Sequence, residues 1–241
     1  MRVTEKMLGL ALLAGGAPAA SAVGVLVPVS SQEVFVPKGF DDNDQVVVVL
    51  DGYLPNSCYQ LDSVSQSIDV ATKTITLQQM ARVYPGQCLM ALVPFTTEVK
   101  LGILSNGQYK IATNRGNFEV SLNVAAATNA GPDDHLYAPV EHAWIQKAQD
   151  GSLSAVLEGR FTNTCMAFDE VQVIYSGKAI EVLPIMKMDD RPDCAEQQVP
   201  YQKVQALSYL LPGRYLLHVR SLNGQAVNTV FPVFEHGSPI E

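Results

Sequence analysis

The sequence states one short stretch twice, first as Gly52-Tyr53-Leu54-Pro55-Asn56-Ser57-Cys58 and again as Gly159-Arg160-Phe161-Thr162-Asn163-Thr164-Cys165. In both copies a glycine is followed by a large apolar residue, an asparagine, a small hydroxyl residue and a cysteine. A second cysteine then comes at a matching distance, because the spacing from Cys58 to Cys88 and that from Cys165 to Cys194 differ by a single position. Two cysteine pairs at nearly one spacing indicate that this part of the chain is duplicated.

Two further landmarks keep the same register beyond the second cysteine of each copy. A proline–aromatic pair follows that cysteine at an equal distance in both copies, and a Gly-x-Tyr triplet follows the aromatic at an equal distance; these are Pro94-Phe95 and Pro200-Tyr201, then Gly107/Tyr109 and Gly213/Tyr215. A repeat that holds from Gly52 to Tyr109 and again from Gly159 to Tyr215 predicts two similar folding units.

The length of 241 residues fits two small domains. The segment 125–136 (AAATNAGPDDHL) is mostly small, polar and turn-rich, and it falls where the repeat needs a boundary. We therefore expect a first domain over 23–124, a linker over 125–136 and a second domain over 137–241. We expect limited proteolysis to cut first within Ala125–Asp134 and to release two fragments that remain folded.

The segment 1–22 has the pattern of a secretory signal peptide. Arg2 and Lys6 precede an apolar Ala/Leu/Gly-rich run from Met7 to Ala20, and Ala20-Ser21-Ala22 matches a small-x-small cleavage site. The Ala-rich signal is typical of bacteria, so we expect a periplasmic or secreted protein with no membrane span after cleavage. A retained N-terminal anchor is the alternative.

The chain has four cysteines, all within the repeat. In an oxidising compartment four cysteines allow three pairings, and duplication favours one bridge in each copy, Cys58–Cys88 and Cys165–Cys194. A structural zinc site would need closely spaced Cys-x-x-Cys pairs, which the sequence lacks.

Strand signals dominate the sequence after position 22. Gln45–Leu50 is a valine run too short for a helix and is expected to form a strand buried on both faces. Turn signals recur at intervals of about 8–12 residues, which is typical of sandwich folds. No long segment has a helical period. This pattern predicts an all-β fold of two tandem antiparallel β-sandwich domains, each with an internal disulfide.

At the level of fold, the two predicted sandwiches resemble immunoglobulin-like or fibronectin-III-like domains, over nearly the whole chain after position 22. The resemblance implies about seven to nine strands per domain in two packed sheets. The sequence departs from antibody-type domains because no tryptophan lies between the paired cysteines.

One acidic loop is a candidate metal site. Asp41, Asp42 and Asp44 offer three carboxylates within a short stretch, which suits calcium. Asp and Asn are also good turn formers, and that alternative explains the loop without an ion.

Catalytic signatures are absent from the sequence. It contains no Gly-x-Ser-x-Gly elbow and no phosphate-binding glycine loop, and its cysteines are assigned to disulfides. His218 lies between apolar residues and is interpreted as a half-buried strand histidine, not a base. Aromatic residues spread through both copies could bind sugars: Tyr53, Tyr59, Tyr84, Tyr109, Phe161, Tyr201 and Tyr215. The equivalent positions of pairs such as Tyr109 and Tyr215 favour a packing role, for example a corner tyrosine bonded to backbone.

Composition restricts the range of partners. A formal net charge of −8 and the lack of any Lys/Arg run argue against nucleic acid. We therefore expect a non-catalytic, exported binding or structural protein of the bacterial envelope that interacts with an envelope protein. The alternative is a carbohydrate-binding module or accessory domain of a secreted hydrolase.

Overall fold

The computed structural model describes residues 23–113, 119–131 and 133–234, so the expected signal peptide lies outside the described residues. Within these ranges no helix is long and apolar enough to cross a membrane. The described strands are β1 (Val25–Val29), β2 (Ser31–Phe35), β3 (Phe40–Asp41), β4 (Val46–Leu54), β5 (Tyr59–Asp69), β6 (Thr74–Val83), β7 (Val93–Gly102), β8 (Gly107–Thr113), β9 (Glu119–Ala125), β10 (Val140–Lys147), β11 (Leu153–Phe161), β12 (Met166–Ser176), β13 (Ala179–Met188), β14 (Val199–Ala206), β15 (Gly213–Ser221) and β16 (Gln225–Val233).

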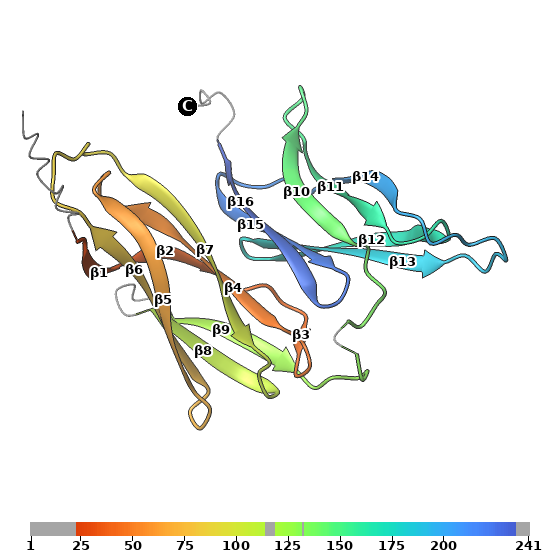
Figure 1. The fold of residues 1–241 in the computed structure, drawn as a ribbon, viewed down its shortest axis with the longest axis horizontal. Helices are drawn as coiled ribbons and strands as arrows, with labels where there is room; N and C mark the ends of the chain where they lie inside the picture. Colours follow the sequence, from red (N-terminus) through yellow and green to blue (C-terminus); the bar gives the residue numbers. More distant parts are fainter. Residues whose placement is uncertain (1–22, 114–118, 132, 235–241) are drawn as a thin grey trace, which may run out of the picture.

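The strands form two β-sandwiches that lie side by side (Figure 1). In the first sandwich, β2-β4-β7 packs on β5-β6-β8-β9, with β1 added to β6 and β3 to β9. In the second, β10-β11-β14 packs on β12-β13-β15-β16. Each sandwich has its own core between its two sheets, one cluster centred on β4, β6 and β8 and the other on β11, β13 and β15. The expected all-β sandwich fold is confirmed.

The duplication extends to the crossing of the first strand between the sheets. In the first sandwich β1 pairs with β6, and the chain then passes through Ser30 into β2 of the other sheet. In the second, Leu136 and Ala138 bond to the end of β13, and the chain then passes through Pro139 into β10. This crossing was not predicted, because the segments concerned are too short to carry a pattern.

The repeated glycine of the opening motif lies beneath this crossing. A Cβ on Gly159 would lie 1.9 Å from the carbonyl oxygen of Pro139, and one on Gly52 would lie 2.8 Å from the Phe95 ring and 3.1 Å from the oxygen of Ser30. A Cβ cannot lie 1.9 Å from a backbone oxygen, so position 159 requires glycine. At position 52 a Cβ would force the Phe95 ring to move.

The Gly-x-Tyr triplets form matching tyrosine corners, as expected. The hydroxyl of Tyr109 donates to the Ser105 carbonyl at 3.0 Å, and that of Tyr215 donates to the Leu211 carbonyl at 2.9 Å. Both rings are buried. Their equivalence thus has a packing origin.

The expectation of purely antiparallel sheets is wrong at three places. Strands β6 and β8 are parallel, as are β13 and β15 and the short pair β3 and β9. Between β6 and β8 the chain passes through β7, and between β13 and β15 it passes through β14. Both of these intervening strands belong to the other sheet, so the chain returns to the first sheet in its original direction. Local sequence patterns report faces and turns, but not the sheet in which the next strand lies.

The two sandwiches contact each other through sheet faces. The outer face of β2-β4 meets the outer face of β13-β15-β16 in a shared apolar cluster: Phe35, Val49, Ala179, Leu216 and Val230. As expected, the valine run of β4 is buried on both faces. One face lies in the core of the first sandwich, and the other is covered by the second sandwich. Strand β15 is buried in the same two-sided way.

Proteolysis should cut the linker without separating the sandwiches. The stretch 129–131 is exposed, so we expect the first cleavage there. Because the apolar cluster and three ion pairs cross between the sandwiches, the two fragments should co-elute in size-exclusion chromatography under native conditions. Elution as two separate fragments would contradict this. Denaturant serves as the control that dissociates them.

Candidate functional site

The acidic loop predicted as a calcium site forms part of the contact between the sandwiches. The side chain of Asp44 faces Arg220 of β15, with both carboxylate oxygens accepting from one Arg220 nitrogen at 2.9 and 3.0 Å. Asp42 accepts the backbone N–H of Ala127 in the linker, and Asp41 accepts the N–H of Asn43. These carboxylates have separate partners and do not converge as a set of ligands. Among the described residues no group of three or more acidic, histidine or cysteine side chains could hold a metal.

The Asp44–Arg220 pair is almost completely buried. The side chain of Arg220 is 6% exposed and that of Asp44 is 2% exposed. The guanidinium also lies over the rings of Phe40 and Tyr137, 5.6 and 5.7 Å from their centroids. Burial alone would lower the pKa of Arg220, but Asp44 and Tyr137 outweigh it and raise that pKa, so the arginine stays charged.

Two more polar side chains are buried beside this pair. Glu181 of β13 accepts the backbone N–H of Lys38, which belongs to the first sandwich. Burial raises the pKa of the Glu181 carboxyl. His218, beside it in register on β15, shares a hydrogen bond of 2.7 Å with Asn228 through Nδ1. Its Nε2 has no hydrogen-bond partner among the described residues. His218 is therefore a fully buried strand histidine, not the half-buried one expected.

A second ion pair holds the other end of the contact. Arg214 donates from Nε and a terminal nitrogen to both oxygens of Asp51, at 2.6 and 2.7 Å. Asp51 is buried and also accepts from the Thr96 hydroxyl at 3.0 Å. Bidentate pairing of a guanidinium fixes orientation as well as distance. Neither arginine was predicted from the sequence, because nothing near Arg214 or Arg220 in the chain marks it as the partner of a distant aspartate.

Replacing Asp44 with alanine should strongly destabilise the protein. The change leaves the Arg220 charge buried without its counter-ion, which costs about 3–5 kcal/mol. Chemical denaturation with two spectroscopic probes measures the free energy of unfolding. The matched control is Asp169→Ala, which breaks an exposed pair with Lys187 and should cost less than about 1 kcal/mol. Equal effects of the two substitutions would show that the buried pair has no special role.

Protonation of His218 should destabilise the fold in mildly acidic solution. Burial lowers its pKa to about 4, with a smaller contribution of the same sign from Arg220, whereas Asn228 raises it. Between pH 6.5 and 4 the unfolded chain binds a proton that the folded chain does not, so the free energy of unfolding falls as the pH falls through this window. The total loss is up to about 3 kcal/mol.

A His218→Phe variant isolates this effect. It keeps a ring beside Phe40 and removes the titrating group, whereas Glu181, whose raised pKa acts with the opposite sign, is present in both proteins. When the free energy of unfolding is measured at several pH values, it should fall less for the variant than for the wild-type protein between pH 6.5 and 4. Parallel curves for the two proteins would contradict the assignment.

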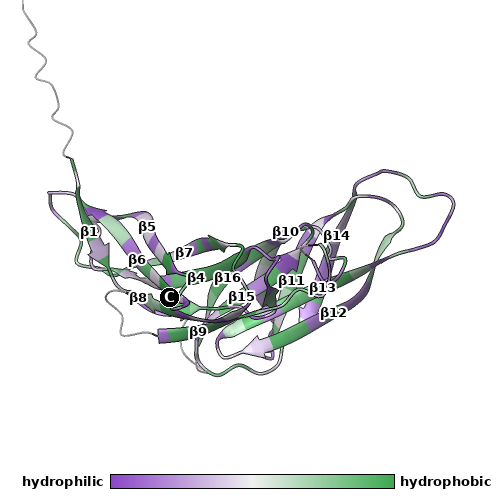
Figure 2. Cartoon of the chain, turned by 90° about the horizontal axis from the view of Figure 1, so that it is seen from below, coloured by the Kyte–Doolittle hydropathy of each residue, from purple (hydrophilic) through white to green (hydrophobic). Residues whose placement is uncertain are grey.

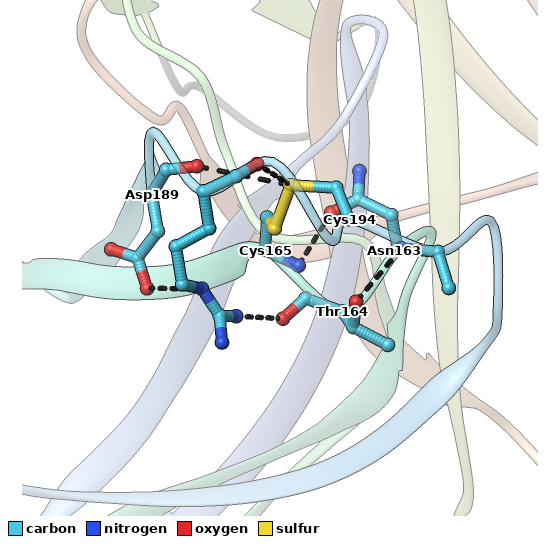
Figure 3. Close-up of a disulfide and its surroundings, with 7 residues drawn as sticks. Asn163, Thr164, Cys165, Asp189 and Cys194 are labelled. Carbon is cyan, nitrogen blue, oxygen red and sulfur yellow. Dashed lines mark hydrogen bonds and ion pairs between the residues drawn. A yellow bond between two sulfur atoms is a disulfide. The ribbon is translucent and has the colours of Figure 1, made fainter.

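Both predicted disulfides are present. Cys58–Cys88 and Cys165–Cys194 have Cα–Cα distances of 5.3 and 5.4 Å. The asparagine of each motif, Asn56 or Asn163, accepts the N–H of the cysteine two positions later. Figure 3 shows this arrangement around Cys165.

The hydroxyl residue of each motif ties the loop that follows the second cysteine. Ser57 donates its N–H to the Leu89 carbonyl at 3.1 Å and accepts the Leu89 N–H through Oγ at 2.9 Å. Thr164 makes the same two bonds with Ala195, at 3.1 and 3.0 Å. A disulfide and two hydrogen bonds therefore fix each loop against its sandwich.

The two fixed loops differ in polarity. In the first, Leu89, Met90 and Leu92 are 74%, 84% and 66% exposed. No charged residue occurs between Arg82 and Glu98. The loop of the second sandwich continues Cys194-Ala195-Glu196-Gln197-Gln198 and is exposed and polar. The loops lie at opposite ends of the molecule, and the polar loop is largely purple at the far end of Figure 2. Three neighbouring exposed apolar residues on a fixed loop are unusual for a protein surface.

The aromatic residues considered as sugar ligands do not form an exposed platform. Tyr109, Tyr215 and Phe161 are buried. Tyr201 stacks on Phe161 and donates its hydroxyl to the Pro139 carbonyl at 2.8 Å. The other members of the set are half-buried: Tyr53, Tyr59 and Tyr84. Of these, Tyr59 and Tyr84 are neighbours, because Tyr59 pairs with Val83 and Tyr84 donates its N–H to the Cys58 carbonyl.

A cleft of about 830 Å³ runs between the sandwiches, lined by the β2–β3 connection, β9 and the β12–β13 turn. Its charged rim includes Glu33, which is paired with Lys178 at 2.6 Å. The cleft belongs to the contact between the sandwiches and presents no nucleophile held by an oriented base among its lining residues.

Comparison with known proteins gives a match to part of the first sandwich. Residues 48–124 match the family model described as the ORF11 beta-sandwich domain. The match begins within β4 and ends within β9, and it agrees with the sandwich found here. No curated protein and no solved structure matches the chain.

Proposed function

We propose that the chain is a non-catalytic binding protein of the bacterial envelope that holds a protein partner on the apolar loop of its first sandwich, residues 86–92. The observation that carries the proposal is the exposure of Leu89, Met90 and Leu92 on a loop fixed by a disulfide. A loop already ordered before binding loses little conformational entropy when a partner covers it. The polar counterpart in the second sandwich indicates that the fold itself does not require apolar residues there.

A protein partner fits the loop better than a membrane or a glycan. The overall charge of −8 disfavours anionic lipid, and the loop has no lysine, arginine or tryptophan to engage headgroups. Sugar binding needs exposed aromatic rings, whereas the repeated aromatics are buried or half-buried. Methionine and leucine on a fixed loop suit an apolar pocket of another protein.

The cellular setting is part of the same proposal. Two disulfides are consistent with a periplasmic or extracellular protein. Export through the predicted signal peptide would place the chain in that compartment. The tandem relation to immunoglobulin-like modules is proposed on the plan of two packed sheets and on the tyrosine corners. The parallel pairs β6–β8 and β13–β15 depart from a purely antiparallel strand arrangement.

Substituting the loop tests the proposed function. The double change Leu89→Ser and Met90→Ser keeps the backbone bonds to Ser57 and alters side chains that are mostly exposed, so the melting temperature should hardly change. Capture of the partner from an envelope fraction, quantified by mass spectrometry, should fall about tenfold or more. The matched control is Ala195→Ser with Glu196→Ser on the equivalent loop.

Two outcomes would overturn the proposal. Undiminished capture by the loop variant would mean that the partner binds elsewhere. Binding of the purified wild-type protein to liposomes or glycans, lost in the variant, would give the loop a different ligand class.

A further inference from the structure

We propose that the outer face of β10-β11-β14 is a second docking surface, which receives a β-sheet face from a different protein that carries an aliphatic cluster and a basic residue. The surface is separate from the loop at 86–92. The proposal is based on an equivalent surface in the same chain, the outer face of β2-β4-β7. That face is covered by the β13-β15-β16 sheet, which carries an aliphatic cluster and Arg214.

Strand registers define which residues correspond. On the covered face, Phe35 of β2 lies beside Val49 of β4. On the second sandwich, Trp144 of β10 lies beside Val156 of β11. Val204 of β14 extends this row at the position that Glu98 occupies on the covered face, so the second sandwich is the more apolar of the two there. Trp144, the single tryptophan of the chain, therefore occupies the position of Phe35. Val156 is 1% exposed and Val204 is 52% exposed.

The polar row beside it also corresponds. On the covered face, Asp51 accepts from the Thr96 hydroxyl of β7 and binds Arg214 of the opposing sheet. On the second sandwich, Glu158 of β11 accepts from Gln202 of β14 at 2.7 Å. Glu158 is paired with Gln202 in the register, as Asp51 is with Thr96. Glu158 is thus oriented in the same way and would receive a guanidinium or ammonium group of the partner.

The remaining outer face shows what a solvated sheet face looks like in this protein. The outer face of β6-β8-β9 is equivalent to the covered face of β13-β15-β16, where Ala179, Leu216 and Val230 form an apolar row. Its corresponding row is polar and consists of Thr74, Lys110 and Ser121. The β10-β11-β14 face keeps an apolar row in which Val156 is already covered, whereas Val204 is exposed and Trp144 is half-buried. These two side chains distinguish the face from the polar row.

A second copy of this chain does not supply the required partner face. The face with the right chemistry, on β13-β15-β16, is already covered by the first sandwich. The duplicate of that face, on β6-β8-β9, would place Lys110 against the apolar row of the docking surface. Lys110 is also already paired with Glu119 at 2.6 Å. The partner is therefore a different protein.

Site-specific photo-crosslinking tests the surface in the full-length protein. A photoreactive amino acid at Val204 reports on the proposed face. One at Ser121, an exposed residue of the polar face that borders the cleft between the sandwiches, serves as the control. We expect one protein to cross-link at position 204 and not at 121, through a β-strand peptide that contains Arg or Lys. Glu158→Gln, which retains an oxygen for the Gln202 bond, should reduce this adduct about tenfold. Glu119→Gln on the control face should not.

Further measurements define the contrary outcomes. The purified partner should shift the fluorescence of Trp144 when added to the wild-type protein, and a Trp144→Ser variant that keeps its melting temperature should lose the adduct. An adduct with a second copy of this chain, equal adducts at 204 and 121, no adduct at all, or an adduct unaffected by Glu158→Gln would each overturn the proposal. Loss of partner capture by the 86–92 loop variant would leave the adduct at 204 intact, so the two sites fail separately.

Discussion

The ion pair between Asp44 and Arg220 is the constraint on which the arrangement of the two sandwiches depends. Both side chains are removed from water, so neither charge is tolerated without the other. A short polar linker could join the sandwiches at many angles, but only one brings this carboxylate to this guanidinium. The buried pair therefore contributes specificity of orientation, whereas the apolar cluster around Phe35 and Leu216 contributes the burial that holds the faces together.

Much of the fold could be predicted from the sequence because its signals are local or repeated. The motif that ends at Cys58 and Cys165 predicted both disulfides, and the structure explains each position that the two copies share: glycine under the strand crossing, asparagine and hydroxyl residue at the loop. The valine run of β4 correctly predicted a strand buried on both faces. It could not say that the second face is covered by the other sandwich, since a hydrophobic run records burial and not its partner.

The candidate site was harder to predict, and the acidic loop shows why. Three aspartates indicate that a cation is near, but calcium and a guanidinium attract the same carboxylates. The partner that the structure gives Asp44 comes from β15, near the other end of the chain. The apolar loop at residues 86–92 lies within a feature that the sequence does show, the uncharged run from Val83 to Thr97. That run reads equally well as a buried strand, and only the structure shows that Leu89 and Met90 are exposed to solvent.

Duplication gives the molecule its asymmetry as well as its symmetry. Each sandwich has two outer sheet faces, and the contact between sandwiches uses a different one from each: β2-β4-β7 from the first and β13-β15-β16 from the second. Such a head-to-tail contact leaves the duplicate of each used face exposed. One of these duplicates carries Thr74, Lys110 and Ser121 and is suited to water. The other retains Trp144 and Glu158, so the geometry that joins the two sandwiches is still available at the far side of the second.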